Sequence, residues 1–426
     1  MKQPKKTRSE GITRRDALKL SGLALGGLAV SGSAGAVKAI AATSKTSRKA
    51  VPIPIQQPPP QGQMRITFCG SWYTPRPNQA CNSVFVEVGN DNNDSFVFDC
   101  GAGVVAKYVA LGVPYSRMDK VLLTHLHGDH MSDLVTIYCF GPATDRKTAL
   151  NVWGPSGDTR NEGTWFFCKN LLEMAKWHRE SFSFLPTGYA GDGDGYDLVA
   201  NELRYMENPG IAYKKNGVKI SHFPAIHARD GAISYKLEWN GFSMVFTGDT
   251  KPNTYVLEHA KEVDILIHEM ASPPSVWVTR ETGLEPGDDG YLEVLAVNTE
   301  VIANSHTEQT AFGYILSQTN PRLGVATHFP NDPDLIAPAM ADIRCFYPSG
   351  SVVIAQDLLV ITVDPDKTIN QYMAAVPEYP WYHAAPLTGQ LARPKYQGPL
   401  AQFNDELLDH IIPAEVYASP GPFCKP

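Results

Sequence analysis

Short apolar runs predict that the first half of the chain is rich in β-strands. "MRITFCG" (64–70), "SVFVEVG" (83–89) and "SFVFDCG" (95–101) place apolar residues on one or both faces of an extended segment. "AGVVAKYVALGV" (102–113) instead spaces its apolar residues as a helix does and stops at a glycine. "DKVLLTH" (119–125) is a buried strand that runs directly into a cluster of histidines.

The second half repeats this alternation of strands and helices, which predicts an α/β fold. The expected elements in chain order are strand 149–157, a helical region over 160–185, strands within 217–228, 233–250 and 263–270, a helical region over 298–318 that opens on His306, strand 323–329, helix 334–346 and a closing strand pair over 351–363.

The two ends of the chain differ from this pattern. Residues 1–42 join a basic start, an Arg14-Arg15 pair and a weakly apolar Gly/Ala-rich core, which predicts a twin-arginine-type signal peptide and a periplasmic or secreted protein. Glycine and serine interrupt the apolar core, so we expect no stable membrane anchor. A proline-rich linker follows over 43–63, then the main domain over 64–363 and a C-terminal extension over 364–426 that packs on it.

Charge and cysteine usage narrow the class of partner and site. The whole chain carries −7, and residues 1–42 hold eight lysines and arginines against two acids, so the remainder carries −13. Such an acidic body is a poor partner for nucleic acid. None of the seven cysteines lies in a CxxC pair, which argues against a zinc site built from cysteines.

The stretch "VLLTHLHGDHMSDL" (121–134) holds the main candidates for chemistry. His125 and His127 alternate onto one side at the end of a strand and can hold one metal ion, while Asp129 and His130, past a glycine, turn toward a second position. Imidazole and carboxylate ligands suit Zn²⁺, and Mn²⁺ or Fe would also fit.

Here the sequence resembles the metallo-β-lactamase-fold hydrolases. "THLHGDH" matches their HxHxDH signature, and "FVFDCGAG", "VWGPSG", "AIHARDGAISYKLE" and "VFTGDT" resemble further elements of the family in the right order. "ILIHEM", "SHTEQTA" and "VATHF" resemble the ribonuclease Z and arylsulfatase branch. The resemblance spans about residues 64–363.

The resemblance implies an αββα four-layer sandwich with the metals at one edge. It implies a first metal held by His125, His127 and His227, a second held by Asp129, His130 and His328, and a bridging Asp249. Asp99 and His268 would support these ligands from behind. Asp129 would also orient the nucleophile, and His306, with Glu269 fixing its tautomer, would protonate the leaving group.

The implied activity is hydrolysis by two Zn²⁺ ions. The ions would share one water and lower its pKa, and the resulting hydroxide would attack a small ester, either an arylsulfate or a phosphodiester. Three alternatives stay open: a lactonase or β-lactamase-like ring-opening hydrolase, a ribonuclease Z-like tRNA 3′-processing endonuclease, and a non-catalytic metal-dependent binding protein.

Two segments predict a narrow pocket. The segment between Glu269 and His306 is longer than the family pattern leads us to expect. The C-terminal extension over 364–426 lies outside the region that resembles the family. Both carry aromatic side chains that would favour a small-molecule ester; the candidates are Trp277, Tyr291, Trp381, Tyr382 and His383. The sequence leaves the oligomeric state open, including a homodimer.

Overall fold

The computed structural model describes residues 55–182, 188–189, 194–376, 391–392, 395–396 and 398. The expected signal peptide, most of the expected linker, and Trp381, Tyr382 and His383 lie outside the described residues. Within the described part of the chain, no helix combines the length and the apolar character needed to cross a bilayer.

The first sheet has eight strands in the order β16-β15-β1-β2-β3-β4-β5-β7. It begins with antiparallel neighbours and becomes parallel from β3 to β7. The bounds are β1 Met64–Gly70, β2 Ser83–Val88, β3 Ser95–Phe98, β4 Lys120–Leu122, β5 Leu150–Pro155, β7 Leu198–Leu203, β15 Leu359–Val363 and β16 Ile369–Met373. The sequence pattern did not predict β7 or β16.

The second sheet has seven strands in the order β14-β13-β12-β11-β10-β9-β8. Its bounds are β8 Gly210–Lys215, β9 Val218–Pro224, β10 Ile233–Trp239, β11 Phe242–Phe246, β12 Ile265–Glu269, β13 Leu323–Thr327 and β14 Val352–Ile354. The prediction of a strand pair over 351–363 was wrong, because β14 extends this sheet while β15 belongs to the first one. A separate short pair joins β6 Gly188–Tyr189 to β17 Leu391–Ala392.

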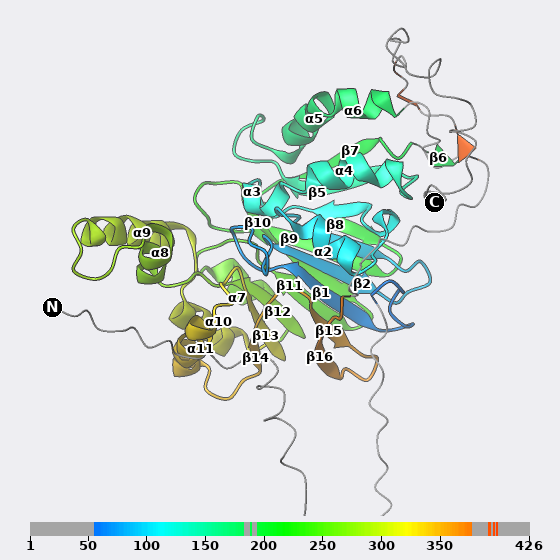
Figure 1. Cartoon of the computed structure of the whole chain (residues 1–426). Helices are drawn as coiled ribbons and strands as arrows, with labels where there is room; N and C mark the ends of the chain where they lie inside the picture. The colour runs from blue at the N-terminus through cyan, green and yellow to red at the C-terminus, as the bar shows by residue number, and fades with distance from the viewer. Residues whose placement is uncertain are drawn as a thin grey trace, which may run out of the picture. The chain divides into compact units, whose positions relative to one another are not determined.

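Helices cover the outer face of each sheet (Figure 1). On the first sheet lie α2 Val104–Ala110, α3 Gly128–Met131, α4 Leu134–Ala143, α5 Thr164–Met174 and α6 Lys176–Ser181. The 3₁₀ turn η1 Tyr115–Arg117 precedes β4. On the second lie α7 Thr254–His259, α10 Gln309–Thr319 and α11 Pro333–Phe346. The pair α8 Pro274–Thr282 and α9 Tyr291–Ser305 projects to one side of this body.

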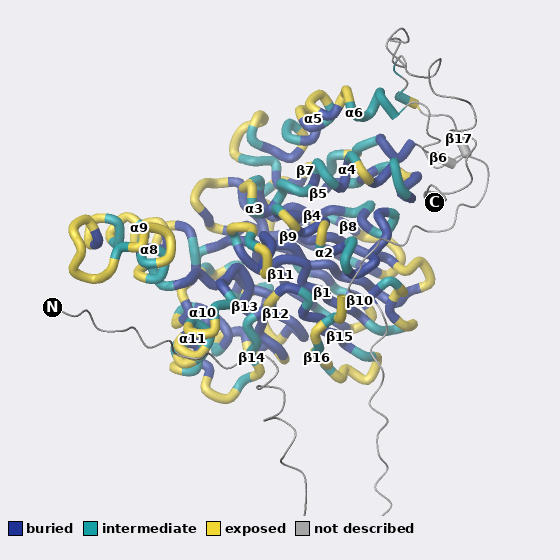
Figure 2. Tube along the Cα trace, in the orientation of Figure 1, coloured by how far each residue is buried: buried dark blue, intermediate teal, exposed yellow. Residues whose placement is uncertain are grey.

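Three apolar layers hold the sandwich together, and they follow the two-residue period of the strands. Val84 and Val86 of β2 pack between the two sheets, while Phe85 points the other way, into the layer under α2 and α4. A third layer joins the second sheet to α7, α10 and α11. Buried residues run through both sheets and exposed ones gather on the outer helices (Figure 2). The predicted αββα sandwich is therefore confirmed.

The helical region expected over 298–318 is two helices rather than one. Helix α9 ends at Ser305, His306 adopts an extended backbone with φ of −134° and ψ of 175°, and α10 begins at Gln309. The break turns His306 out of any helix and toward the edge of the second sheet where β12 and β13 end.

Candidate metal centre

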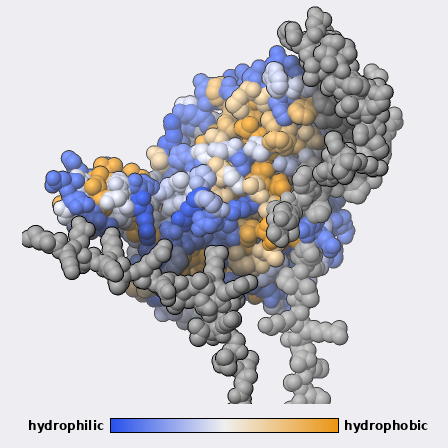
Figure 3. All heavy atoms as spheres, in the orientation of Figure 1, coloured by the Kyte–Doolittle hydropathy of each residue, from blue (hydrophilic) through white to orange (hydrophobic). Residues whose placement is uncertain are grey.

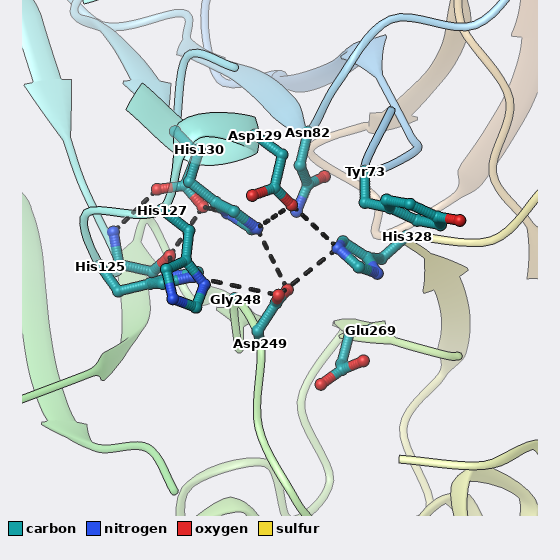
Figure 4. Close-up of polar contacts among 12 residues, drawn as sticks. Tyr73, Asn82, His125, His127, Asp129, His130, Gly248, Asp249, Glu269 and His328 are labelled. Carbon is teal, nitrogen blue, oxygen red and sulfur yellow. Dashed lines mark hydrogen bonds and ion pairs between the residues drawn. The ribbon is translucent and has the colours of Figure 1, made fainter. Parts of the chain in front are cut away.

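The candidate ligands all follow strands that end at one edge of the sandwich. His125, His127, Asp129 and His130 come after β4, with the last two in the short helix α3. His227 follows β9, Asp249 follows β11 and His328 follows β13. Both sheets therefore contribute ligands, and Figure 4 shows the side chains converging on Asp249.

The first group of ligands consists of His125, His127 and His227. Their nitrogen atoms lie within 4.8 Å of one another, close enough to hold one ion. His227 Nε2 is 3.1 Å from His127 Nδ1. Burial lowers the pKa of His125 and His227 below the usual value, and His127 shifts the same way. All three imidazoles are thus favoured in the neutral form that binds a metal.

The second group consists of Asp129, His130, Asp249 and His328. Asp129 Oδ2 lies 3.2 Å from the Nε2 atoms of both His130 and His328. Asp249 Oδ1 is 3.2 Å from His130 Nε2, and its Oδ2 is 3.4 Å from His328 Nε2.

Asp249 is shared between the two groups. Its Oδ2 also lies 3.8 Å from His227 Nε2 and 4.0 Å from His125 Nε2. One carboxylate thus faces ligands of both groups, as a bridging residue must. The His/Asp clusters are consistent with a dinuclear metal site.

The chemistry of these atoms fits bound cations. His125 Nε2 is buried and has no hydrogen-bond partner among the described residues. Buried polar atoms rarely stay unpaired unless they bind something else. His227 Nδ1 donates to the Ser305 carbonyl at 2.7 Å, which leaves its Nε2 with a free lone pair facing the other ligands.

Asp99 supports the centre from beneath. It accepts hydrogen bonds from Thr124 N at 2.7 Å and Thr124 Oγ1 at 2.8 Å, and its Oδ2 lies 2.7 Å from His130 Nδ1. These contacts fix the ring of His130. Gly248, before Asp249, has φ of +57°, and a Cβ there would lie 2.5 Å from the Thr124 side chain. Only glycine therefore allows β11 to approach this support so closely.

His306 and Glu269 form a pair beside both ligand groups. His306 Nδ1 lies 3.0 Å from Glu269 Oε2 and 3.2 Å from its Oε1. Burial by itself lowers the pKa of His306, but the Glu269 carboxylate outweighs burial and raises the pKa to about 9. The His306 ring is 5.0 Å from that of His227 and 5.5 Å from that of His328. The pair therefore faces the space that both groups border.

The other expected site residues lie in different places. His268 packs its ring 5.7 Å from Phe312 of α10, on the opposite face of β12 from Glu269, and its Nδ1 bonds to the Glu269 carbonyl. Among the described residues, no hydrogen bond or ion pair links His268 to a candidate ligand. Tyr291 begins α9 and is buried. Trp277 of α8 does approach the centre, with its ring 6.3 Å from that of His306.

The sequence pattern missed the aromatic residues after β1. Trp72 and Tyr73 place their rings 6.3 and 5.8 Å from the ring of His328. The sequence could have indicated Trp72 and Tyr73, because they follow a predicted strand, β1, that ends at the same edge as the ligands. Phe166 and Phe167 of α5 line a cavity that also touches His125, and nothing in the local sequence indicates this.

The sandwich and its two ligand groups define a class of protein. Residues 95–329, more than half of the chain, match the family described as the beta-lactamase superfamily domain. The chain belongs to that superfamily, and its site is that of a metal-dependent hydrolase of the superfamily.

Comparison with individual proteins places the chain near the ribonuclease Z/BN group at low identity. It is 25% identical over 260 residues to ribonuclease Z of Archaeoglobus fulgidus, which covers 55% of this chain and 83% of the relative. It is 24% identical over 233 residues to ribonuclease BN of Proteus mirabilis, covering 48% and 76%. The metallo-beta-lactamase fold protein YhfI of Bacillus subtilis superposes with a TM-score of 0.50 at 18% identity, over 70% of this chain and 99% of that one.

Proposed function

We propose that this chain is a dinuclear-metal hydrolase that cleaves a small ester, either a phosphodiester or an arylsulfate. The observation that carries the proposal is the His306–Glu269 pair beside a centre whose two ligand groups share Asp249. A charged leaving oxygen needs a proton donor, and this pair supplies one within reach of both groups.

Two divalent cations would supply Lewis acidity at the centre, which would lower the pKa of water toward neutrality and polarise the ester. The first would be held by His125, His127 and His227, the second by Asp129, His130 and His328, with Asp249 between them. Asp129 has an oxygen facing the same space and would accept a hydrogen bond from the attacking water, which fixes its direction of approach.

His306 would complete the reaction. Its Nδ1 is held by Glu269, so Nε2 is the nitrogen that can face the substrate. As the water oxygen bonds to phosphorus or sulfur, the bond to the leaving oxygen breaks with its electron pair. His306 donates its proton to that oxygen and regains one from the water that attacked.

The ribonuclease Z relatives make a tRNA-processing activity the second candidate. The matched region covers 83% of the length of the Archaeoglobus fulgidus ribonuclease Z, and this similarity favours a phosphodiester. Charge argues against a large polyanion. The projecting pair α8–α9 and its connections, residues 274–305, carry one arginine and six acids, and RNA approaching the centre would meet this surface. We therefore propose a small substrate and no nucleic acid partner.

A substrate panel tests the proposal. Metal-loaded protein should hydrolyse a chromogenic phosphodiester or arylsulfate with kcat/KM at least ~10²-fold above a chromogenic lactone or β-lactam, because we propose the former as the substrate class. Precursor tRNA should remain uncleaved. Preference for the β-lactam or lactone, or cleavage at a tRNA 3′ end, would replace the proposal with that activity.

We further propose export through the twin-arginine route, on the basis of Arg14-Arg15 and the weakly apolar segment after them. Replacing both arginines with lysine keeps the charge but should leave the protein in the cytoplasm. Fractionation of cells expressing the full chain measures this. Replacing Lys5 and Lys6 with arginine is the matched control and should not alter export. Normal export of the Arg14→Lys/Arg15→Lys variant would refute the route.

A further inference from the structure

Two cavities border the metal centre on opposite sides. The first has a volume of about 500 Å³ and is lined by His125, His127 and His227 together with residues of α5. The second has a volume of about 370 Å³ and lies between the loop after β1 and helix α8. Two of its lining residues approach the centre, since the ring of Tyr73 is 5.8 Å from that of His328 and the ring of Trp277 is 6.3 Å from that of His306. Figure 4 shows His125 and His127 on one side of Asp249, and His328 with Tyr73 on the other.

The first cavity has apolar walls and a polar rim, where Asp230 adds a carboxylate beside the pair of Arg229 and Glu162. Leu126, Phe166 and Phe167 form its walls, beside the ligands of the first group. At the mouth, Arg229 donates to Glu162 at 2.7 Å, so the arginine already has a carboxylate partner. An uncharged apolar group would gain most from this surface, since burying apolar area is favourable and an anionic group would meet Asp230.

The second cavity is aromatic. Trp72, Tyr73 and Trp277 line it, with the rings of Tyr73 and Trp277 5.2 Å apart. Its two arginines are also paired with carboxylates. Arg76 lies 3.0 Å from Asp332, and Arg280 lies 2.5 Å from Asp334. Flat, uncharged groups stack well on such surfaces.

The wall of the second cavity is held in place by buried hydrogen bonds. Asp357 accepts from Ser71 Oγ at 3.0 Å and from Ala80 N at 2.7 Å, and so ties down both ends of the loop that carries Trp72 and Tyr73. On the opposite wall, the indole N–H of Trp277 donates to Ser272 Oγ. The aromatic surface is therefore largely preformed.

The exposed side of α8–α9 does not take part in this cavity. Figure 3 shows hydrophobic surface on this projecting pair. Leu292 and Val297 of α9 are 76% and 61% exposed. Nothing in the structure shows what would cover them.

We propose that the two cavities select an ester with an uncharged organic group on each side of the reacting atom. This inference rests on the proposed function. The leaving oxygen must lie near His306, so the leaving group occupies the second cavity against Trp277. The retained group then occupies the first cavity against Phe166. A sulfate monoester has one organic group and would fill only one cavity, so the geometry points to a phosphodiester. Phe166 and Trp277 are the residues that set specificity for the two sides.

Two substrates with the same leaving group separate the cavities. The metal-loaded protein should hydrolyse naphthyl 4-nitrophenyl phosphate with kcat/KM about tenfold or more above methyl 4-nitrophenyl phosphate, because only naphthyl fills the first cavity. Phe166→Ala should bring the ratio close to one. Trp277→Ala should slow both substrates alike and leave the ratio intact, because both carry nitrophenolate into the second cavity.

Trp165→Ala is the matched control. Trp165 precedes Phe166 on α5 and is 40% exposed, but it does not line the cavity, so its loss should leave the ratio unchanged. A ratio near one in the unaltered protein, or a ratio that survives Phe166→Ala, would overturn the assignment. The assignment would also be overturned if Trp277→Ala abolished the preference for the naphthyl substrate while Phe166→Ala kept it. If Phe166→Ala fails to fold, Phe166→Leu should lower the ratio in the same direction, and an unchanged ratio there counts against the assignment equally.

A binding measurement keeps this inference separate from the proposed function. Calorimetric titration of metal-loaded protein with naphthyl phosphate and with methyl phosphate needs no turnover. Naphthyl phosphate should bind about tenfold more tightly, and Phe166→Ala should remove the difference. If no phosphodiester is hydrolysed, the proposed function fails while this result still decides the role of the first cavity. If phosphodiesters are hydrolysed but the two phosphates bind equally, the cavity assignment fails alone.

Discussion

Replacing Asp249 with alanine should remove metal and activity together. Asp249 faces both ligand groups, with oxygens 3.2 to 4.0 Å from four imidazole nitrogens, so its loss leaves two nearby cations without the negative charge between them. We expect the unaltered protein to carry close to two transition-metal ions per chain, mostly zinc, and Asp249→Ala to carry at most one. Activity should fall by more than ~10³-fold, since even residues behind the ligands cost about 10–100-fold. Elemental analysis and turnover measure the two effects.

Asp264→Ala is the control for this variant. Asp264 is also a buried aspartate of the second sheet, but it precedes β12 at the far edge, where it bonds to Ser243 and Arg322. Its loss should lower stability while both metals remain. Should Asp249→Ala retain two metals after careful purification, the shared-carboxylate interpretation would be wrong. One metal or none in the unaltered protein, with no activity gained on adding zinc, would refute the dinuclear site.

Replacing His306 with alanine should reduce turnover and leave the metals in place. The proposed role of His306 is to protonate the leaving oxygen, a contribution of ~10²–10⁴-fold for a general acid. The deficit should be large for an ester of a simple alcohol and much smaller for a nitrophenyl ester, because nitrophenolate leaves without a proton. Turnover on a series of leaving groups, together with elemental analysis of the same preparations, measures this.

The metal content of this variant decides between two roles. His306 lies within 4.8 Å of His227 and Asp249, and also of Glu269 and His328, so the geometry alone would allow it to be a ligand. Loss of a metal would place it among the ligands. A deficit equal for good and poor leaving groups would show that it is not the proton donor. His268→Ala, which changes the neighbouring residue of Glu269 on the opposite face of β12, should leave the leaving-group dependence unchanged.

The sequence by itself determined the superfamily fold and identified the candidate ligands that the structure brings together. Strand periodicity located β1 to β5 and β9 to β13, because one face or both faces of each are buried. His125, His127, Asp129 and His130 lie within six positions, so one short motif contains four of the seven candidate ligands. The more distant ligands follow strand ends, and their order along the chain is enough to identify them by resemblance.

Only the tertiary structure decided the arrangement that surrounds these ligands. The strand region over 351–363 divides between two sheets, which local pattern cannot reveal because the pairing partners are distant in sequence. His268 and Glu269 are adjacent, yet the alternation of β12 sends one to the core and the other to the centre. The cavities, too, join Phe166 to His125 and Trp277 to Tyr73. Sequence motifs record residues that share one strand or loop, whereas specificity arises where segments far apart in the chain pack together.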